Sequence, residues 1–298
     1  MSWLEIRCTL PSARVEAAEF VLEASGAVSV TFTDANDQPI LEPALGTIPL
    51  WDFTVVTGLY TLDADVPAVM TLLSEQLTLR PDQISCTTLE DQEWTRAWMS
   101  HFKPMDFGQK LAVCPTGFEP VPNRINLKLD PGLAFGTGTH ATTRLCLEWL
   151  DTLACSGKLE GKTVIDYGSG SGILAIGAAL LGAKHVVCVD NDPQALTATL
   201  DNAQRNRVEA KISVYLPDDL PADTAPADVM VANILANPLI ELSERICGLT
   251  AAGGALGLSG ILAEQAGSVV AAYRSEIDSL TVSQNEDWVR VDGTKSDS

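Results

Sequence analysis

The sequence predicts an α/β protein in which a mostly parallel sheet, covered by helices, follows a small α+β domain. From about Asp130 onward, continuous apolar strands alternate with helical segments, the pattern of a parallel sheet buried on both faces. Before residue 90 the segments follow the order β-α-β-β-α-β, which is typical of a ferredoxin-like domain. The length of 298 residues is enough for two domains with separate cores.

In the first domain, strands are predicted over residues 3–10, 28–33, 53–62 and 83–89 from apolar alternation or β-branched runs. Helices are predicted over 13–24 and 67–77. The first helix directs Val15, Ala18 and Leu22 inward, and Phe20 more weakly, and it ends at Gly26. Since no glycine loop or reactive cluster falls before residue 90, this domain is expected to bind or position a partner.

Residues 91–125 are expected to link the domains. A helix over 91–102 carries Trp94 and Trp98 on one face, and packing between domains is the favoured role for this pair over a substrate platform. Short strands and turns are expected over 103–122 because several prolines and glycines interrupt that stretch. The second domain then covers residues 126–298.

The second domain has predicted strands over 164–167, 186–190, 212–216, 229–233 and 255–259, and a terminal hairpin near 280–282 and 288–291. Ligands of parallel sheets bind at the carboxyl ends of the strands. Gly168, Asp190 and Asn233 all lie at the carboxyl ends of predicted strands, so these three residues are predicted to share one site.

The segment from Asp166 to Gly172 has the pattern D-x-G-x-G-x-G between a strand and a helix. Gly168 and Gly170 let the main chain approach a ligand closely, and Asp190 stands where an acid that binds ribose hydroxyls is expected. A dinucleotide fold has a third glycine where this chain has Ile173. The pattern instead resembles the first motif of Rossmann-like methyltransferases, and that resemblance implies S-adenosylmethionine as the cofactor. The alternative role for Asp190 is a helix N-cap, which Asn191 or Asp192 can also provide.

The loop 130–140 leads into a helix predicted over 142–153, and the start of a helix suits an anion such as the methionine carboxylate of the cofactor. Thr142 and Thr143 are candidate donors, although Thr139 or Thr142 is also suited to capping the helix. Phe135 either covers the methionine moiety or is a core aromatic. His140 is either a base or a residue that orders the loop.

The composition predicts a globular protein, with 46% hydrophobic and 19% charged residues. A net charge of −20 disfavours nucleic acid and favours basic partners. The start of the chain lacks a secretory signal, and the longest apolar run is too short to span a bilayer, so a cytoplasmic location and no membrane partner are expected. Seven scattered cysteines without a Cys-x-x-Cys pair favour reduced thiols over a metal site.

Four segments together resemble one known family: DPGLAFGTGTH at 130–140, ATT at 141–143, IDYGSGSGILAI at 165–176 and VANILANPL at 231–239. They are similar to the bacterial ribosomal protein L-eleven methyltransferases, also called protein methyltransferase A. The resemblance implies a substrate-recognition domain (1–90), a linker (91–125) and a Rossmann-like, S-adenosylmethionine-dependent methyltransferase domain (126–298). The implied substrate is a basic protein of the large ribosomal subunit, methylated on its terminal α-amine and lysine ε-amines.

The resemblance also places the site. Family cofactor positions fall on Thr143, Gly168, Asp190 and Asn233, and the same loops add Asp166, Gly170, Phe135 and His140 as candidates. Asn233 is predicted to aim the amine by accepting its N–H bonds, with the alternative that it only forms a turn. The competing interpretations are a methyltransferase acting on another protein or a small amine, a non-catalytic ribosome-assembly module and, last, a nicotinamide dehydrogenase.

Overall fold

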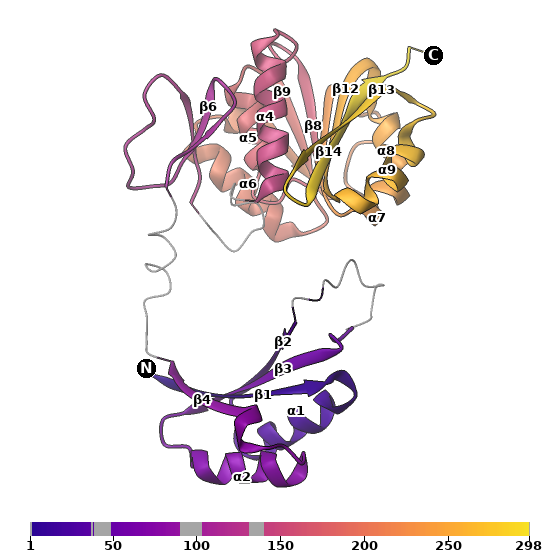
Figure 1. Ribbon diagram of the computed structural model, residues 1–298. Coiled ribbons are helices and arrows are strands. Elements are labelled where there is room, and N and C mark those ends of the chain that lie inside the picture. The colour runs from indigo at the N-terminus through magenta and orange to yellow at the C-terminus, as the bar shows by residue number, and fades with distance from the viewer. Residues whose placement is uncertain (1, 37, 39–48, 90–102, 131–139, 298) are drawn as a thin grey trace. The chain divides into compact units, whose positions relative to one another are not determined.

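The computed structural model of this protein describes residues 2–36, 38, 49–89, 103–130 and 140–297 (Figure 1). The chain divides into two compact units, Met1–Ala97 and Trp98–Ser298. The predicted linker helix, with Trp94 and Trp98, lies outside the described residues, and so does Phe135.

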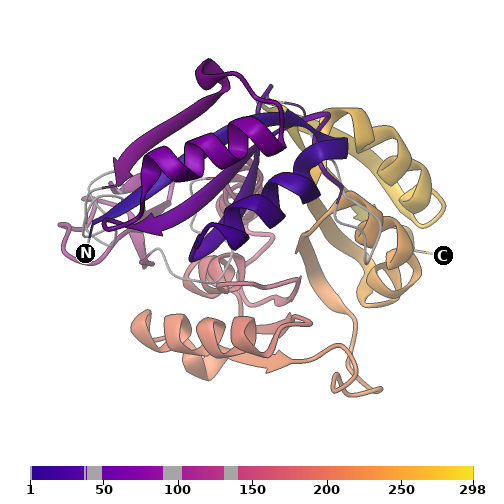
Figure 2. The same ribbon diagram turned by 90° about the horizontal axis from the view of Figure 1, so that it is seen from below.

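The first unit is a four-stranded antiparallel sheet with two helices on one of its faces (Figures 1 and 2). Its elements follow the expected order: β1 (Trp3–Pro11), α1 (Val15–Ala24), β2 (Ser29–Asp34), β3 (Phe53–Thr61), α2 (Val66–Gln76) and β4 (Ile84–Leu89). The strands lie in the order β2-β3-β1-β4. Asp65 caps α2 by accepting a hydrogen bond from the Ala68 N–H, and Pro67 follows in the first turn.

Helix α1 buries Val15, Ala18 and Leu22 as predicted, but the weak inward assignment of Phe20 is wrong. The Phe20 side chain is 69% exposed, and Val21 occupies the inward position instead. With 3.6 residues per turn, the buried stripe passes through residues 18, 21 and 22, which leaves residue 20 on the outer side.

The second unit contains a seven-stranded sheet in the order β10-β9-β8-β11-β12-β14-β13. Its five parallel strands are β8 (Thr163–Tyr167), β9 (His185–Val189), β10 (Ile212–Tyr215), β11 (Ala227–Asn233) and β12 (Thr250–Leu262). The antiparallel hairpin of β13 (Ile277–Asn285) and β14 (Trp288–Lys295) completes the sheet beside β12. The predicted α/β class, the parallel sheet and the terminal hairpin are confirmed.

Helices cover both faces of this sheet. Alternate strand residues such as Val164 and Val229 join one core cluster with α4 (Ala141–Cys155), α5 (Ile173–Leu180) and α6 (Pro193–Arg205). Their neighbours, such as Ile165 and Met230, join a second cluster with α7 (Ala236–Glu241), α8 (Ser243–Gly248) and α9 (Ala266–Tyr273). This alternation is why the strands are apolar at successive positions.

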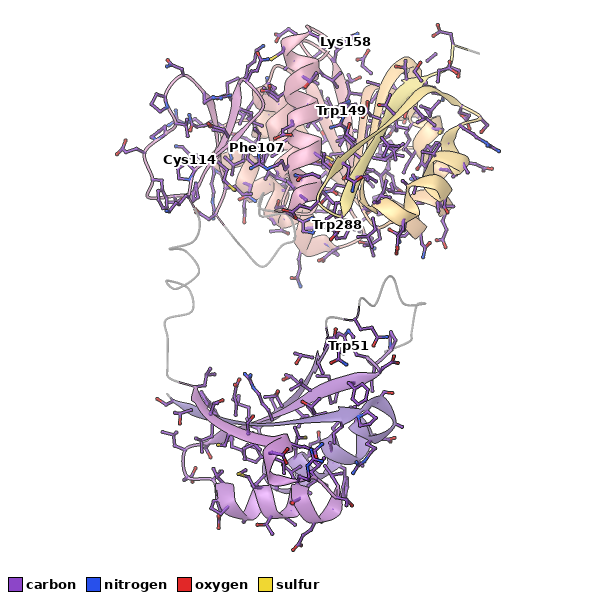
Figure 3. The ribbon with its side chains drawn as sticks, viewed as in Figure 1. Trp51, Phe107, Cys114, Trp149, Lys158 and Trp288 are labelled. Atoms are coloured by element: carbon purple, nitrogen blue, oxygen red, sulfur yellow. The ribbon has the colours of Figure 1, made fainter. Side chains whose placement is uncertain are left out.

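Residues 103–130 form a three-stranded sheet that packs into the second unit: β5 (Met105–Phe107), β6 (Leu111–Cys114) and β7 (Ile125–Lys128). The fully buried side chains of Phe107, Leu111 and Leu127 share a core with α4. Phe107 and Trp149 of this core are labelled in Figure 3. The carboxylate of Asp151 on α4 accepts three main-chain N–H bonds from the β5–β6 turn, at 2.6–3.1 Å. A Cβ at Gly108 would overlap that side chain, so glycine is required at the turn.

All seven cysteines are free thiols. Cys155 is exposed and Cys86 is half-buried, whereas five are buried: Cys8, Cys114, Cys146, Cys188 and Cys247. Within the described ranges, no cluster of side chains is suited to holding a metal ion. None of the helices that the structure describes is long and apolar enough to cross a membrane.

Candidate functional site

Strand register brings Asp190, Gly168 and Asn233 to one edge of the sheet. Tyr167 on β8 is paired with Val189 on β9 and with Ala232 on β11, and each of the three candidate residues comes next in its chain segment. The N–H of Gly168 donates to the Val189 carbonyl at 2.7 Å. The predicted juxtaposition of these strand ends is therefore observed.

The glycine turn has a conformation that side chains would prevent. Gly168, Gly170 and Gly172 have φ values of +84°, +54° and +78°, in the left-handed region. A Cβ at Gly168 would overlap Cγ2 of Ile234, and one at Gly172 would lie 2.8 Å from Cγ2 of Thr199. The turn is thus built for close packing on both sides.

Two side chains of α6, which the sequence did not single out, hold the glycine turn from behind. The Thr199 hydroxyl donates to the Gly170 carbonyl at 3.1 Å, and the Asn202 amide donates to the Ser171 carbonyl at 2.9 Å. Both side chains are buried on the inner side of the helix. Polar residues three apart on an inward helical face were the signal that could have identified them.

The Asp190 carboxylate binds the glycine turn directly. One oxygen accepts from the Gly170 N–H at 2.8 Å, and the other accepts from the Asp192 N–H at 3.0 Å. Asp192 itself caps α6 by accepting from the Gln194 N–H, so the capping alternative belongs to Asp192. Each carboxylate oxygen has a second lone pair, and Asp190 is only half-buried, so it retains acceptor capacity for a ligand.

Asp166 is a fully buried carboxyl at the start of the same turn. Oδ2 accepts from the Ala175 N–H at 3.0 Å, whereas Oδ1 has no hydrogen-bond partner among the described residues. Burial raises the pKa of Asp166 to about 7, opposed by the Ala175 N–H and increased by the nearby Asp190 charge. A buried polar atom without a partner is unusual in a folded protein and suits a ligand donor.

Helix α4 begins at its predicted place, but its cap is His140, so the suggested cap at Thr142 is wrong. His140 Nδ1 lies 2.8 Å from the Thr142 hydroxyl and accepts a long bond, 3.4 Å, from the Thr142 N–H. The imidazole also packs edge-on against Trp288 of β14, with ring centroids 4.7 Å apart. This geometry supports the loop-ordering interpretation of His140. Thr143 lies buried in the first turn of α4.

Asn233 is the last residue of β11, is paired with Ser259 of β12, and is half-buried. Ile234 and Leu235 follow it, and the Leu235 side chain is 53% exposed at the edge of the sheet. Helix α7 begins at Ala236. A carboxamide therefore stands next to the glycine turn, with apolar side chains beyond it.

Comparison with known proteins agrees with this geometry. A family model described as ribosomal protein L11 methyltransferase (PrmA) matches residues 2–296. Proteins named ribosomal protein L11 methyltransferase from Hahella chejuensis and from Pseudomonas aeruginosa are 48% and 49% identical over 296 and 297 residues, covering 99% of this chain and 99% of each relative. The chain belongs to this family.

A solved structure extends the likeness to three dimensions. The chain resembles the crystal structure of a ribosomal protein L11 methylase from Lactobacillus delbrueckii subsp. bulgaricus, with a TM-score of 0.55 and 29% identity. The match covers 65% of this chain and 98% of that one. This protein is thus a methyltransferase with S-adenosylmethionine as its methyl donor, which disfavours the dehydrogenase and non-catalytic interpretations.

The residues of this methyltransferase fit that donor. The turn leaves no room for a Cβ at Gly168, and Asp166 holds an unpartnered oxygen at its base. Residue 173 is a buried isoleucine where a dinucleotide fold has glycine, and S-adenosylmethionine has no phosphate to place there.

Proposed function

We propose that this methyltransferase modifies ribosomal protein L11, on its terminal α-amine and on lysine ε-amines. The observation that carries the proposal is the full-length match to relatives of that name. The carboxamide of Asn233 beside the glycine turn supports an amine substrate, because it offers an acceptor for amine N–H groups.

We assign the cofactor to the residues around the glycine turn. Asp190 accepts hydrogen bonds from the ribose hydroxyls, and Gly168 and Gly170 admit the ligand close to the main chain. Asp166 offers its unpartnered oxygen to the donor's ammonium group. At the start of α4, the Thr143 hydroxyl donates to the carboxylate while His140 orders the helix terminus.

The donor supplies an electrophilic methyl group on a sulfonium. The difficulty for the protein is the acceptor, since a protonated lysine has no lone pair and its reference pKa is about 10.4, against about 8 for an α-amine. Asn233 accepts a hydrogen bond from one N–H of the neutral amine, and this directs the nitrogen lone pair toward the methyl group. The apolar edge beyond it, with Leu235, disfavours the charged amine by desolvation. The proton leaves to solvent.

The Asn-Ile-Leu-Ala segment at 233–236 favours an alkylamine over a planar base or amide. It contains no aromatic ring to stack on a planar group. A flexible amine needs instead an acceptor for its N–H groups, which the Asn233 carboxamide offers.

We assign substrate recognition to residues 1–90 and the methyltransferase domain to residues 126–298, joined by a linker over 91–125 whose strands β5 and β6 pack against the methyltransferase domain. The charge of the first unit supports this assignment, because its 97 residues carry 15 acidic side chains and four basic ones. Such a surface favours a basic protein over nucleic acid.

The function is tested by incubating the full chain with S-adenosylmethionine and a panel of purified ribosomal proteins, followed by mass spectrometry. Methylation of L11 at its amino terminus and lysines is expected, and modification of a different protein would overturn the substrate assignment. Asn233→Ala should retain cofactor affinity and lose about 100-fold in kcat, the scale of a misplaced reactant. Full turnover by that variant would contradict the aiming role.

A further inference from the structure

Ile234, the residue after Asn233, is held between two glycines from different segments. On one side is Gly168 of the glycine turn, where a Cβ would overlap Cγ2 of Ile234. On the other side is Gly260 in β12, where a Cβ would overlap the Ile234 carbonyl oxygen and lie 2.7 Å from its carbonyl carbon. One glycine thus contacts the side chain of Ile234, and the other contacts its main chain.

The conformation of Gly260 is itself unusual for a strand. Its φ is +87°, and the pairing of β12 with β14 shifts register between Leu258 and Ile261. Ser259, the partner of Asn233, donates its hydroxyl to the Val289 carbonyl at 2.9 Å. A glycine bulge inside a strand, beside a site, is a known means of redirecting a strand end.

We propose that Ile234 is a positioning residue, and that Gly168 and Gly260 clamp it so that Asn233 points in one direction. The proposal deepens the assignment of Asn233 given above and rests on it. Aiming a lone pair requires an acceptor fixed to within about half an ångström, which one strand end cannot secure alone. The clamp also links the glycine turn to Asn233, because Gly168 of that turn contacts Ile234 and Asn233 precedes Ile234 in the chain.

The first test compares Gly260→Ala with Gly161→Ala. Gly161 has a φ of +70° and open space around its Cβ position, so its substitution adds similar backbone strain without a contact. Gly260→Ala should lower kcat by roughly 10- to 100-fold while the cofactor Kd and the KM for protein substrate stay within about threefold. Gly161→Ala should keep its kcat. Unchanged kcat in Gly260→Ala, or a cofactor Kd that worsens as much as kcat, would overturn the clamp.

The second test uses the different atoms that the two glycines meet. Ile234→Ala removes Cγ2, so it makes room for a side chain at position 168 but not at position 260, where the neighbour is main chain. The kcat of Gly168→Ala/Ile234→Ala should therefore be at least about threefold higher than that of Gly168→Ala. The kcat of Gly260→Ala/Ile234→Ala should be no higher than that of Gly260→Ala. Equal recovery in both pairs, or in neither, would contradict the geometry. Circular dichroism verifies that each variant is folded.

A third variant separates this proposal from the proposed function. If Gly260 acts through Asn233, then adding Gly260→Ala to Asn233→Ala should lower kcat by no more than about twofold. Additive losses would overturn the positioning role while leaving the substrate assignment intact. A wild-type chain that methylates a protein other than L11 would instead fail the proposed function, and the same variants are then measured on that protein.

Discussion

Asp166 is completely buried, and among the described residues its carboxyl accepts one hydrogen bond, from the Ala175 N–H. Burial raises its pKa to about 7, so its protonation changes near neutral pH. Its reference pKa is 3.8, so between about pH 4 and 7 the folded protein holds a proton that the unfolded chain has released. The contribution of Asp166 to stability therefore falls as the pH rises through this window and is constant above it.

Asp166→Asn removes that dependence. The free energy of unfolding of the variant minus that of wild type should be roughly 3 kcal/mol larger at pH 8 than at pH 5. Urea unfolding at the two pH values measures the gain. An identical difference at both would show that Asp166 is ionised throughout, contrary to its burial. The same variant is expected to bind S-adenosylmethionine more weakly, because the paired charge is lost.

Asp190 and Asp192 are two neighbouring carboxylates with separate roles. Asp190→Asn should weaken cofactor binding by about 10- to 100-fold in calorimetry, since hydrogen bonds to a charged group contribute about 1.5–3 kcal/mol. Asp192→Ala is the matched control, and it should lower stability by about 1 kcal/mol through loss of the α6 cap with little change in affinity. Equal affinity losses in the two variants would reject the assignment of the ribose to Asp190.

Some of the site could be predicted at this scale. Gly168, Asp190 and Asn233 were placed together because parallel strands must end at the same edge, whatever their side chains do. The sequence signals Thr199 and Asn202 only as polar residues on an inward helical face, and it specifies neither the carbonyl groups that they bind nor the cap at His140. These contacts depend on how one helix is rotated against its neighbours, and a single sequence does not specify that rotation.

At the scale of elements, the turn between β5 and β6 depends on Asp151 of α4. Asp151→Ala would leave three main-chain N–H groups without their acceptor, in a location that is buried for Leu111 and partly buried for Gln109 and Lys110. The expected loss is at least about 3 kcal/mol in free energy of unfolding. Thr152→Ala, one residue along on the exposed side of α4, should change it by less than about 0.5 kcal/mol. Similar urea midpoints for the two variants would contradict the anchoring role.

Strands were predicted well where the apolar pattern was clear, whereas the buried face of α1 was predicted only in part. The five parallel strands of the second unit lie where apolar runs predicted them, because burial on both faces leaves a continuous signal. On α1, apolar residues at 18, 20, 21 and 22 permitted two inward faces, and packing against the sheet selected the one without Phe20.

The charge of the whole molecule bears on how a substrate is found. A net charge of −20 attracts a basic protein over distances that salt shortens. The association rate with L11 should therefore fall by roughly tenfold between 50 and 300 mM salt in stopped-flow measurements. The cofactor Kd, measured alongside, should change little. A rate independent of salt would remove any role for steering.

The buried thiols make unfolding of this protein detectable by alkylation. Burial raises the pKa of Cys8 to about 11 and that of Cys146 to about 12, so the reactive thiolate is scarce while the fold is closed. Iodoacetamide will then mark Cys155 first and reach the five enclosed sulfurs only in molecules that have unfolded. The number of carbamidomethyl groups on each chain consequently reports its conformational history, without any engineered label.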